Sequence, residues 1–552
     1  MTTDTSTGRR LRRGLAAWPF AVAGLVSAAV LFATAELVAA FFATASSPMV
    51  AMGAVFIDIT PPWLKDLAIA TFGTNDKLAL FVSIGIVSAI AAALIGILAR
   101  RRFGLAAGTI ALLGAAIGAS VLSRPATGPL DVLPTIVGTL AGIGTLRLLT
   151  DRARAAVGDT PAGAGGPRRA GEYVVRRTPS GTTPDAATGT RAGAGKSSRR
   201  GFLAAAGLAA VAAGAMAVGG RALSGVRNAA QATREALRLP APKTRAEPLP
   251  AGVAADVEGM PPFVTPNADF YRIDTALAVP RIEPSEWSLR VHGMVEEEFT
   301  ITFDELLQTE LQETWVTLTC VSNAVGGDLV GNAKWLGYPL RSILERARPQ
   351  AGADMVLSTS IDGFSASTPL EVLTDDRDAL LAVGMNGEPL PLEHGFPVRM
   401  VVPGLYGYVS ATKWVVDLEV TRFADKAAYW TTRGWDERGP IKIASRVDVP
   451  RAFAKVPAGR AAFGGTAWAQ QRGIDKVQIR IDDGEWRDAE LAAEASVDTW
   501  RQWSYVWEDA TPGPHSVSVR AVDGTGEVQT EERADPIPNG ASGWQRIQFT
   551  VE

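Results

Sequence analysis

The chain has 552 residues, of which 47% are hydrophobic and 20% charged, and these proportions exclude a disordered or fibrous protein. Its length exceeds what one hydrophobic core supports, so several domains are expected. The net charge of −3 is the sum of a basic first half and an acidic second half. Residues 1–250 carry 27 Lys and Arg against 12 Asp and Glu, and residues 251–552 carry 27 Lys and Arg against 45 Asp and Glu. The acidic second half would repel a phosphate backbone, so no nucleic-acid binding is predicted.

Cysteine and histidine are scarce. The chain holds one cysteine, Cys320, and three histidines, His292, His394 and His515, all beyond residue 250. One cysteine excludes an intrachain disulfide, an iron–sulfur cluster and a zinc site built on cysteines. The absence of histidine from the first half of the sequence excludes a bis-histidine haem there. We therefore expect no haem and no iron–sulfur cluster.

Residues 1–150 are predicted to form a membrane domain with four transmembrane helices. The apolar stretches run over about 15–42, 78–98, 103–122 and 130–149. The stretch 78–98 has no charged residue, and as a helix it spans about 31 Å, which is close to the thickness of a hydrocarbon core. Soluble helices are seldom this long and this apolar.

Basic residues predict the orientation of these helices. Arginines gather before the first stretch, between the second and third, and after the fourth, whereas the opposite loops hold only Lys65, Lys77 and Arg124. The positive-inside rule then places the N-terminus in the cytoplasm. Residues 57–72 are expected to lie along the outer membrane surface. A lone acid near the outer end of a span, Glu36, gives little reason to predict transport.

Residues 151–200 are rich in Gly, Ala, Pro, Thr and Arg and predict a flexible cytoplasmic linker. An apolar run follows, so residues 201–220 are predicted to form a fifth transmembrane helix that ends outside and stays as an anchor. The residues at its start resemble a twin-arginine export signal: Ser198-Arg199-Arg200-Gly201-Phe202-Leu203. The alternative is an ordinary span with basic flanking residues. In both cases the linker 221–254 and everything after it are extracytoplasmic.

Residues 255–435 have the composition of a soluble α+β domain, and the single cysteine occupies a notable place in it. In the block Thr317-Leu318-Thr319-Cys320-Val321-Ser322-Asn323 it ends a predicted strand and enters a loop with two glycines. A lone cysteine is often only a small buried side chain. At the end of a strand, however, a reactive group is held rigidly and stays accessible.

Further segments surround this block in a definite order. Together they resemble the sulfite oxidase family of molybdopterin-dependent oxidoreductases, in the form of a membrane-anchored bacterial member, and the likeness covers residues 260–552. The segments are Phe263-Val264-Thr265-Pro266-Asn267, Phe270-Tyr271-Arg272, Trp287-Ser288-Leu289-Arg290-Val291-His292-Gly293, Asp362-Gly363-Phe364, Met385-Asn386-Gly387-Glu388-Pro389-Leu390-Pro391, His394-Gly395-Phe396-Pro397-Val398-Arg399, Val402-Pro403-Gly404-Leu405-Tyr406-Gly407 and Lys413-Trp414.

The resemblance implies a molybdenum–molybdopterin cofactor, with the Cys320 thiolate as metal ligand and catalytic residue. A soft thiolate suits this metal, and Arg399 and Lys413 would supply positive charge for the pterin phosphate. Singly, each residue has an ordinary structural alternative, such as an acid partner for Arg399 or a surface position for Lys413. The residues at or near the family's cofactor-binding positions are Asn267, Tyr271, Arg272, Ser360, His394, Arg399, Ser410, Thr412 and Lys413.

The sequence departs from the family where sulfite is bound. Sulfite oxidases proper carry arginines just after the C-x-x-N stretch, and these places here hold Ala324, Val325 and Gly326. The family's pocket tyrosine also gives way to Trp435. Without the arginines a small dianion would be held weakly, so sulfite itself is not the predicted substrate.

Residues 436–552 are predicted to form an all-β, immunoglobulin-like sandwich. Alternating apolar residues such as Val477, Ile479 and Ile481 indicate strands, and Asp482-Asp483-Gly484 indicates a hairpin turn. Because this module often mediates dimerisation in the family, a homodimer is one expectation. The fold class is thus multidomain: transmembrane α-helices, an α+β sulfite-oxidase-like molybdopterin domain and a C-terminal sandwich.

These features predict a multi-pass enzyme of the cell membrane whose extracytoplasmic domain transfers an oxygen atom on a small-molecule substrate. Oxidation is the leading direction, and a sulfoxide-type reductase of the same superfamily is the close alternative. A separate electron carrier, either a cytochrome or a quinone-linked protein, is expected. Twin-arginine export machinery and membrane lipid are the other expected partners. The rival from another class is a membrane transporter or scaffold whose outer domain only binds.

Overall fold

The computed structural model describes residues 17–42, 46–60, 76–123, 128–157, 194–226, 229–276 and 278–552. The chain divides into two compact units, Met1–Val226 and Arg227–Glu552, and each is described by itself. The predicted orientation depends partly on the arginines before residue 14 and on Lys65 and Arg124, and these lie outside the described residues, as does most of the predicted linker.

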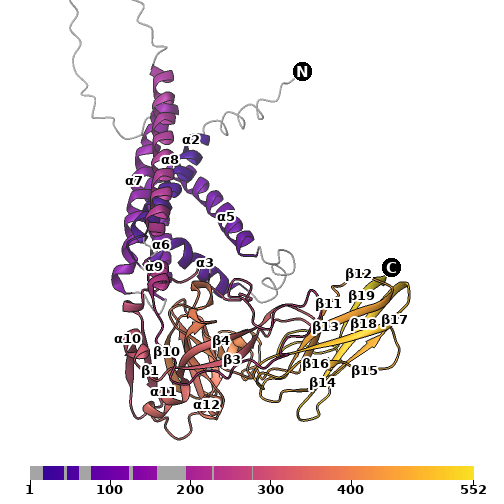
Figure 1. Cartoon of the computed structure of the whole chain (residues 1–552). Helices are drawn as coiled ribbons and strands as arrows, with labels where there is room; N and C mark the ends of the chain where they lie inside the picture. Colours follow the sequence, from indigo (N-terminus) through magenta and orange to yellow (C-terminus); the bar gives the residue numbers. More distant parts are fainter. Residues whose placement is uncertain are drawn as a thin grey trace, which may run out of the picture. The chain divides into compact units, whose positions relative to one another are not determined.

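The first unit is helical (Figure 1). Its described residues contain five helices long and apolar enough to cross a membrane, which confirms the predicted apolar stretches. They belong to α2 (Trp18–Ala39), α5 (Asp76–Ala99), α6 (Phe103–Leu122), α7 (Leu133–Val157, preceded by the 3-10 turn Pro129–Val132) and α8 (Ala194–Val226).

Helix α2 packs against α5, α7 and α8. Small residues permit this close approach, as is usual between membrane helices. A Cβ atom added to Gly24 would lie 2.0 Å from the carbonyl oxygen of Ala92, and one added to Gly96 would lie 2.1 Å from that of Phe20. Helices α2 and α5 therefore meet backbone to backbone.

The acid predicted near the outer end of the first span has a structural role. Glu36 Oε1 accepts a hydrogen bond from Ser47 Oγ (2.7 Å) and one from the backbone N–H of Met49 (3.3 Å). It thereby satisfies donors at the start of α3 (Pro48–Ile59), a helix too short to cross a bilayer. These contacts account for Glu36 without a transport role.

Helix α8 begins at Ala194, before the predicted start of the fifth span at residue 201. The sequence from Ala194 to Leu203 contains no proline, and extending an existing helix costs much less than starting one. The twin-arginine-like residues therefore lie within a helix rather than in an extended linker.

The α+β part of the second unit contains two mainly antiparallel sheets, with one large buried core and a second, smaller one. One sheet has the order β2 (Phe299–Thr302), β1 (Ser288–Gly293), β10 (Val415–Thr421), β5 (Met355–Ser360) and β6 (Ser365–Pro369), and only β1 and β10 run parallel. The other has the order β3 (Gln312–Thr319), β4 (Val330–Pro339), β7 (Leu380–Met385) and β8 (Glu388–Pro389), with β9 (Arg399–Val401) also paired to β7.

Short helices complete this α+β part, and the largest fully buried side chains include Trp287, Trp335 and Trp414. All six residues of β7 are buried, as expected for a central strand covered on both faces. The helices are α9 (Ala229–Ala236), α10 (Phe303–Leu307), α11 (Leu340–Ala347), α12 (Leu370–Thr374) and α13 (Gly407–Ser410).

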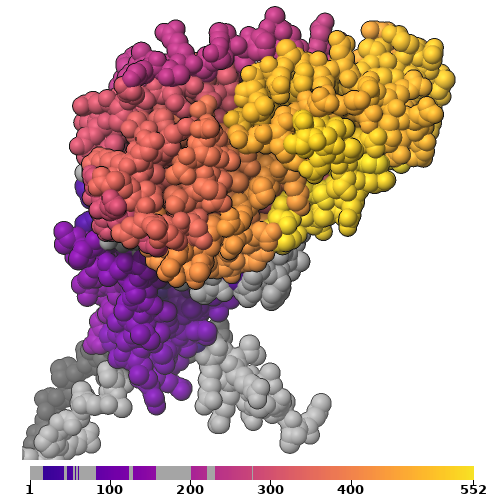
Figure 2. Space-filling view, turned by 90° about the horizontal axis from the view of Figure 1, so that it is seen from below, coloured from indigo at the N-terminus to yellow at the C-terminus, as the bar shows by residue number. Residues whose placement is uncertain are grey.

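The C-terminal part consists of two further sheets that share one core. The first has the order β11 (Ala444–Val449), β13 (Gly459–Trp468), β17 (Arg501–Ala510) and β16 (Glu490–Leu491). The second has the order β12 (Lys455–Val456), β19 (Gln545–Val551), β18 (Gly513–Asp523), β14 (Ile474–Ile481) and β15 (Arg487–Asp488). The alternating residues Val477 and Ile479 point into the shared core, as predicted. The immunoglobulin-like topology stays a prediction. Figure 2 shows this part, in yellow, directly against the orange and pink surface of the α+β part.

Candidate active site

One cavity in the second unit brings together the residues that the sequence singled out. It has a volume of about 910 Å³ including its open mouth. Its wall contains Cys320, His394, Arg399 and Lys413, which come from three separate chain segments. Aromatic side chains form another part of the wall: Phe364, Tyr408, Trp430 and Trp435.

The loop between β3 and β4 presents Cys320 to this cavity. The backbone N–H of Cys320 donates to Leu329 O (2.9 Å), and that of Leu329 donates to the side chain of Asn323 (2.9 Å). The asparagine of the C-x-x-N stretch thus fastens the two ends of the loop together. Burial raises the pKa of the Cys320 thiol, while hydrogen bonds from Ser322 oppose that rise. Without a cation or metal beside it, this cysteine stays a thiol at neutral pH.

Two cations lie on neighbouring strands at the cavity wall. Arg399 begins β9 and pairs through an isolated bridge with Lys413, just before β10. Gly395 lets the preceding turn come close, because a Cβ there would lie 2.9 Å from Arg399 Cβ and the backbone φ is +112°. The turn that starts at His394 therefore brings a histidine, an arginine and a lysine to one place.

Arg399 is buried yet bonds only to backbone among the described residues. Its guanidinium donates to His394 O (3.1 Å), Met400 O (3.3 Å) and Ala411 O (3.5 Å), and no described carboxylate forms an ion pair with it. The sequence alternative of an acid partner for Arg399 is wrong. Lys413, also buried, pairs with Asp274 Oδ2 at 2.7 Å, so its surface alternative is wrong as well.

The electrostatics of this end of the cavity favour a bound anion. Burial lowers the pKa of Lys413 to about 8 and that of Arg399 to about 10. Burial, and after it the charges of Arg399 and Lys413, lowers the pKa of His394 to about 4, so this ring is neutral at pH 7. Lys413 shares the Asp274 carboxylate with Arg272, and Arg399 has no carboxylate partner among the described residues, so an anionic group would balance the excess charge.

The structure places six of the predicted residues in the cavity wall: Tyr271, Cys320, Ser360, His394, Arg399 and Lys413. The other four lie just behind it. The backbone oxygen of Asn267 is 3.1 Å from His394 Nε2, and Arg272 Nε donates to Asp274 (2.8 Å), the partner of Lys413. Thr412 exchanges a hydrogen bond with Ser358 (2.7 Å), and Ser410 Oγ donates to Tyr406 O (3.0 Å).

Sequence reasoning missed several residues of the wall. Asp274, Asp362, Phe364 and Tyr408 were within or beside quoted segments but were given no role. For Asp274 a signal existed, since an acid two residues after Arg272 and close to predicted cations is a ready ion-pair partner. Trp435 was expected near the pocket and does line it, together with Trp430.

The residues that replace the family's sulfite-binding arginines lie elsewhere. Ala324, Val325 and Gly326 line a second, smaller cavity behind the Cys320 loop, together with Tyr406 and Gln529. In the larger cavity, Arg399 is the one arginine of the described wall.

Comparison with known proteins agrees with these observations. The family model "Oxidoreductase molybdopterin binding domain" matches residues 276–430. The uncharacterized oxidoreductase YuiH of Bacillus subtilis is 31% identical over 155 residues, which are 28% of this chain and 75% of that protein. The chain belongs to the sulfite oxidase family. Its residues 276–430 carry the molybdopterin-binding domain of that family.

Sulfite oxidases match over a longer stretch of the chain. Mitochondrial sulfite oxidase of Mus musculus is 28% identical over 342 residues, and the match covers 52% of this chain and 62% of that protein. Sulfite oxidase of Arabidopsis thaliana is 26% identical, over 56% of this chain and 93% of the plant protein. Among solved structures, the sulfane dehydrogenase SoxCD of Paracoccus pantotrophus is 22% identical with a TM-score of 0.47, over 53% of this chain and 84% of that one.

The cavity fits the cofactor of the sulfite oxidase family. No group of three or more His, Cys, Asp or Glu side chains gathers as a metal site within the described ranges. Cys320 offers one soft thiolate ligand at the cavity wall, which suits a molybdenum cofactor. The buried Arg399, which lacks a carboxylate partner in the described part of the chain, suits a phosphate.

Proposed function

We propose that this chain is a membrane-anchored, extracytoplasmic enzyme that transfers an oxygen atom to or from a small substrate. The observation that carries the proposal is the position of Cys320 in the same cavity as Arg399, a buried cation without an acid partner among the described residues. A soft metal ligand and an unbalanced positive charge together call for a metal cofactor that carries an anionic group.

Each residue at the site has a proposed task. Cys320 would ligate molybdenum, and Arg399, Lys413 and His394 would hold the phosphate and pterin. Tyr271 and Ser360 would complete the inner wall. Asn267, Arg272, Ser410 and Thr412 would support these side chains from behind, as their hydrogen bonds indicate. The bound cofactor would supply two-electron, oxygen-atom chemistry.

Two tyrosines near Cys320 have a raised phenol pKa. Burial, and after it the charge of a Cys320 thiolate, raises the pKa of Tyr406 to about 12 and that of Tyr271 further. Both phenols therefore remain protonated over the physiological range. Tyr271 lines the active-site cavity and can donate a hydrogen bond to an anion or oxygen there without becoming charged, whereas Tyr406 lines the smaller cavity behind the loop.

The substrate side of the cavity favours an uncharged organic molecule over sulfite. The aromatic rings form a continuous series, with centroid distances of 6.1 Å for Trp430–Trp435 and 5.8 Å for Tyr408–Trp435. Such rings recognise apolar or polarizable groups. Oxidation is the leading direction, and reduction of a sulfoxide-type group is the alternative that a sulfur-binding aromatic wall also supports.

The first unit supports the proposed export and anchoring. Five apolar helices support a protein that contacts membrane lipid, and the motif at 198–203 supports twin-arginine export. Replacing Arg199 and Arg200 by lysines should leave residues 251–552 on the cytoplasmic side, inaccessible to external protease. Normal accessibility in that variant would reduce the motif to the flank of a span.

Electrons must leave or reach the site through a partner, so a separate cytochrome or quinone-linked protein completes the proposal. The acidic residues 251–552 favour a basic soluble carrier, whose association would slow as salt rises. A homodimer through the C-terminal part is a further expectation carried over from the family.

A substrate panel distinguishes the candidates. The purified chain should show substrate-dependent reduction or oxidation of its molybdenum signal with neutral thioethers, aldehydes or sulfoxides, and a weaker response to sulfite. Fast turnover of sulfite would overturn the assignment of substrate class. A chain that binds small molecules but contains no molybdenum would favour the rival, a transporter or binding scaffold.

A further inference from the structure

The loop that carries Cys320 is held at its base by its own residues. The backbone N–H of Asn323 donates to Cys320 O (3.0 Å), and the Asn323 side chain accepts from Leu329 N. The tip at Ala324–Gly327 has only a tight turn of its own, from Gly327 N to Ala324 O (2.8 Å). The tip therefore needs support from outside the loop if Cys320 is to keep one direction.

That support comes from β11 in the C-terminal part. Arg446 donates from one terminal nitrogen to Gly327 O at 2.9 Å, and its side chain is 9% exposed. Asp448 holds the other side of the guanidinium, with 2.8 Å between Arg446 Nε and Asp448 Oδ1. Asp448 in turn accepts a hydrogen bond from Thr466 Oγ1 (3.0 Å). The arginine is thus fixed at both ends.

A second contact comes from the last strand, β19. The side chain of Gln545 accepts a hydrogen bond from Val447 N, next to Arg446. Its amide also lies against the loop tip, because a Cβ added to Gly326 would be 2.5 Å from Gln545 Nε2. Gly326 has φ of +76°, so both its conformation and this close approach require glycine.

The strand that leads to Cys320 is fastened to the same C-terminal part. Thr317 N donates to Asp498 O (3.0 Å), and Thr317 O accepts from Gln470 Nε2 (3.0 Å). The backbone N–H of Trp500 donates to Thr317 Oγ1 (2.8 Å). Three polar contacts therefore fix the backbone three residues before the cysteine.

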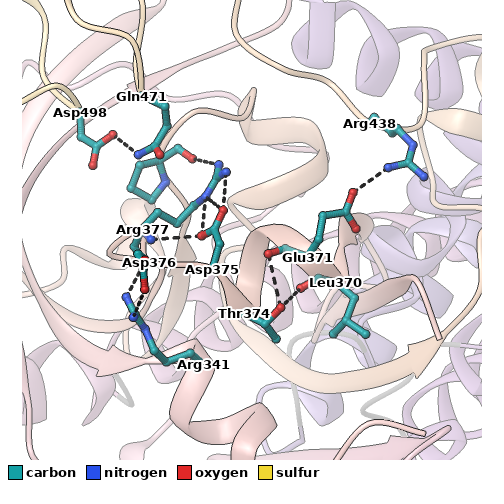
Figure 3. Close-up of polar contacts among 11 residues, drawn as sticks. Arg341, Leu370, Glu371, Thr374, Asp375, Asp376, Arg377, Arg438, Gln471 and Asp498 are labelled. Atoms are coloured by element: carbon teal, nitrogen blue, oxygen red, sulfur yellow. Dashed lines mark hydrogen bonds and ion pairs between the residues drawn. The ribbon is translucent and has the colours of Figure 1, made fainter. Parts of the chain in front are cut away.

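The edge of this contact is polar as well (Figure 3). Gln471 Nε2 donates to Asp498 Oδ1 (2.6 Å), and Arg377, held by Asp375, donates to Pro403 O (2.8 Å). A Cβ on Gly404 would lie 3.0 Å from Gln471 Cγ. The first hydrogen bond lies within the C-terminal part and the second within the α+β part, and the two parts meet at this edge where Gly404 approaches Gln471.

We propose that Arg446 and Gln545 are positioning residues for Cys320. From the C-terminal part they fix the tip of the cysteine loop and so the direction in which the sulfur faces the cavity. The inference rests on the proposed function only in assigning the sulfur to molybdenum. Through these two residues the C-terminal part would help to position the metal ligand.

The single cysteine permits a test that needs no cofactor. In cofactor-free protein, the rate of alkylation by iodoacetamide reports on Cys320 alone. A double variant, Arg446→Met with Asp448→Asn, removes the contact without leaving a buried charge unpaired. It should react at least about tenfold faster than wild type, since a loosened loop exposes the sulfur. Gln545→Leu should give a smaller increase.

The control is Arg520→Met in the same C-terminal part. Arg520 lies over Trp486 (4.3 Å) and bonds to Gln478, far in the sequence from the loop and without a described contact to it. This variant should alkylate at the wild-type rate. Equal rates for the wild type, the double variant and Gln545→Leu would overturn the proposal. If the double variant fails to fold, Gln545→Leu decides.

A second readout uses the loaded enzyme. At equal molybdenum content the double variant should show a changed electron paramagnetic resonance spectrum of Mo(V). Its kcat should be lower by about 100-fold with KM nearly unchanged, because a shift of the ligand by about 1 Å has an effect of that size. A wild-type spectrum and kcat in that variant would contradict the proposal. Absence of molybdenum from the wild type would overturn the proposed function instead, while the alkylation result would still stand.

Discussion

Lys413 Nζ lies 2.7 Å from Asp274 Oδ2, and the two side chains are 9% and 5% exposed. The residues are 139 positions apart in the sequence. Arg272 also donates to Asp274, so one buried carboxylate serves two cations. The ion pair between Asp274 and Lys413 joins the segment before β1 to the bridge between Arg399 and Lys413.

Removing the carboxylate should destabilise the second unit. Asp274→Asn leaves Lys413 buried without a charged partner, and breaking such a pair costs about 3–5 kcal/mol of unfolding free energy. Denaturant unfolding of the cofactor-free chain measures the change. The matched control is Glu419→Gln, which removes a partially exposed pair with Lys426 and should cost about 0–1 kcal/mol. Equal effects of the two substitutions would contradict the buried role of Asp274.

Cofactor retention should depend on the charge of Lys413. Because burial lowers the pKa of Lys413 to about 8, the cofactor-free site is cationic below that pH and loses one positive charge above it. Affinity for an anionic phosphate is therefore highest below pH 8 and should fall by up to about tenfold per pH unit above it. Pterin release followed between pH 7 and pH 9.5 checks this. Lys413→Arg should remove the dependence, and an unchanged pH profile in that variant would refute it.

Asp498 should make stability depend on pH in the opposite sense to an ordinary carboxylate. Burial raises its pKa to about 6, and the Gln471 hydrogen bond only partly opposes that rise. The folded state then binds a proton that the unfolded state releases near pH 4, so this contribution to stability is complete below pH 4 and lost as pH rises through 6. Asp498→Asn should unfold at higher denaturant than wild type at pH 7.5 and equally at pH 4. A less stable variant at pH 7.5 would disprove the raised pKa.

The sequence predicted much of this site because its motifs are local. Cys320 and Asn323 stand three residues apart at the end of one strand, and His394 and Arg399 share one turn. Contacts made by distant segments could not be predicted. The pairing of Lys413 with Asp274 and the bond from Arg446 to Gly327 each join residues more than 100 positions apart.

In the fold, too, local features could be predicted from the sequence and features that depend on distant contacts could not. Apolar stretches and alternation predicted the five long helices and the strand β14. The early start of α8 at Ala194 was missed, because helix extension through polar residues leaves no apolar signal. The place of Ala324 and Val325 in a second cavity was missed too, since it depends on how the C-terminal part packs against the loop.

Cys320→Ser should keep the fold and abolish turnover, because a hydroxyl is a poor ligand for a soft metal site. The two side chains have similar size, and the hydrogen bonds of residue 320 to Leu329 and Asn323 are made by its backbone. Circular dichroism and denaturant unfolding should match wild type within about 1 kcal/mol, since one small buried atom changes. Full turnover by the serine variant would remove Cys320 from the reaction.

The content of metal and cofactor in the purified full-length chain tests the central claim most directly. Expressed in a host that makes molybdopterin, it should contain about one molybdenum and one pterin per chain, as one thiolate ligand implies, with no haem, flavin or iron. The Cys320→Ser variant should lack the absorption band that arises from the bond between the cysteine sulfur and molybdenum. Wild-type protein without molybdenum, or with a Soret band that survives stringent purification, would contradict the account.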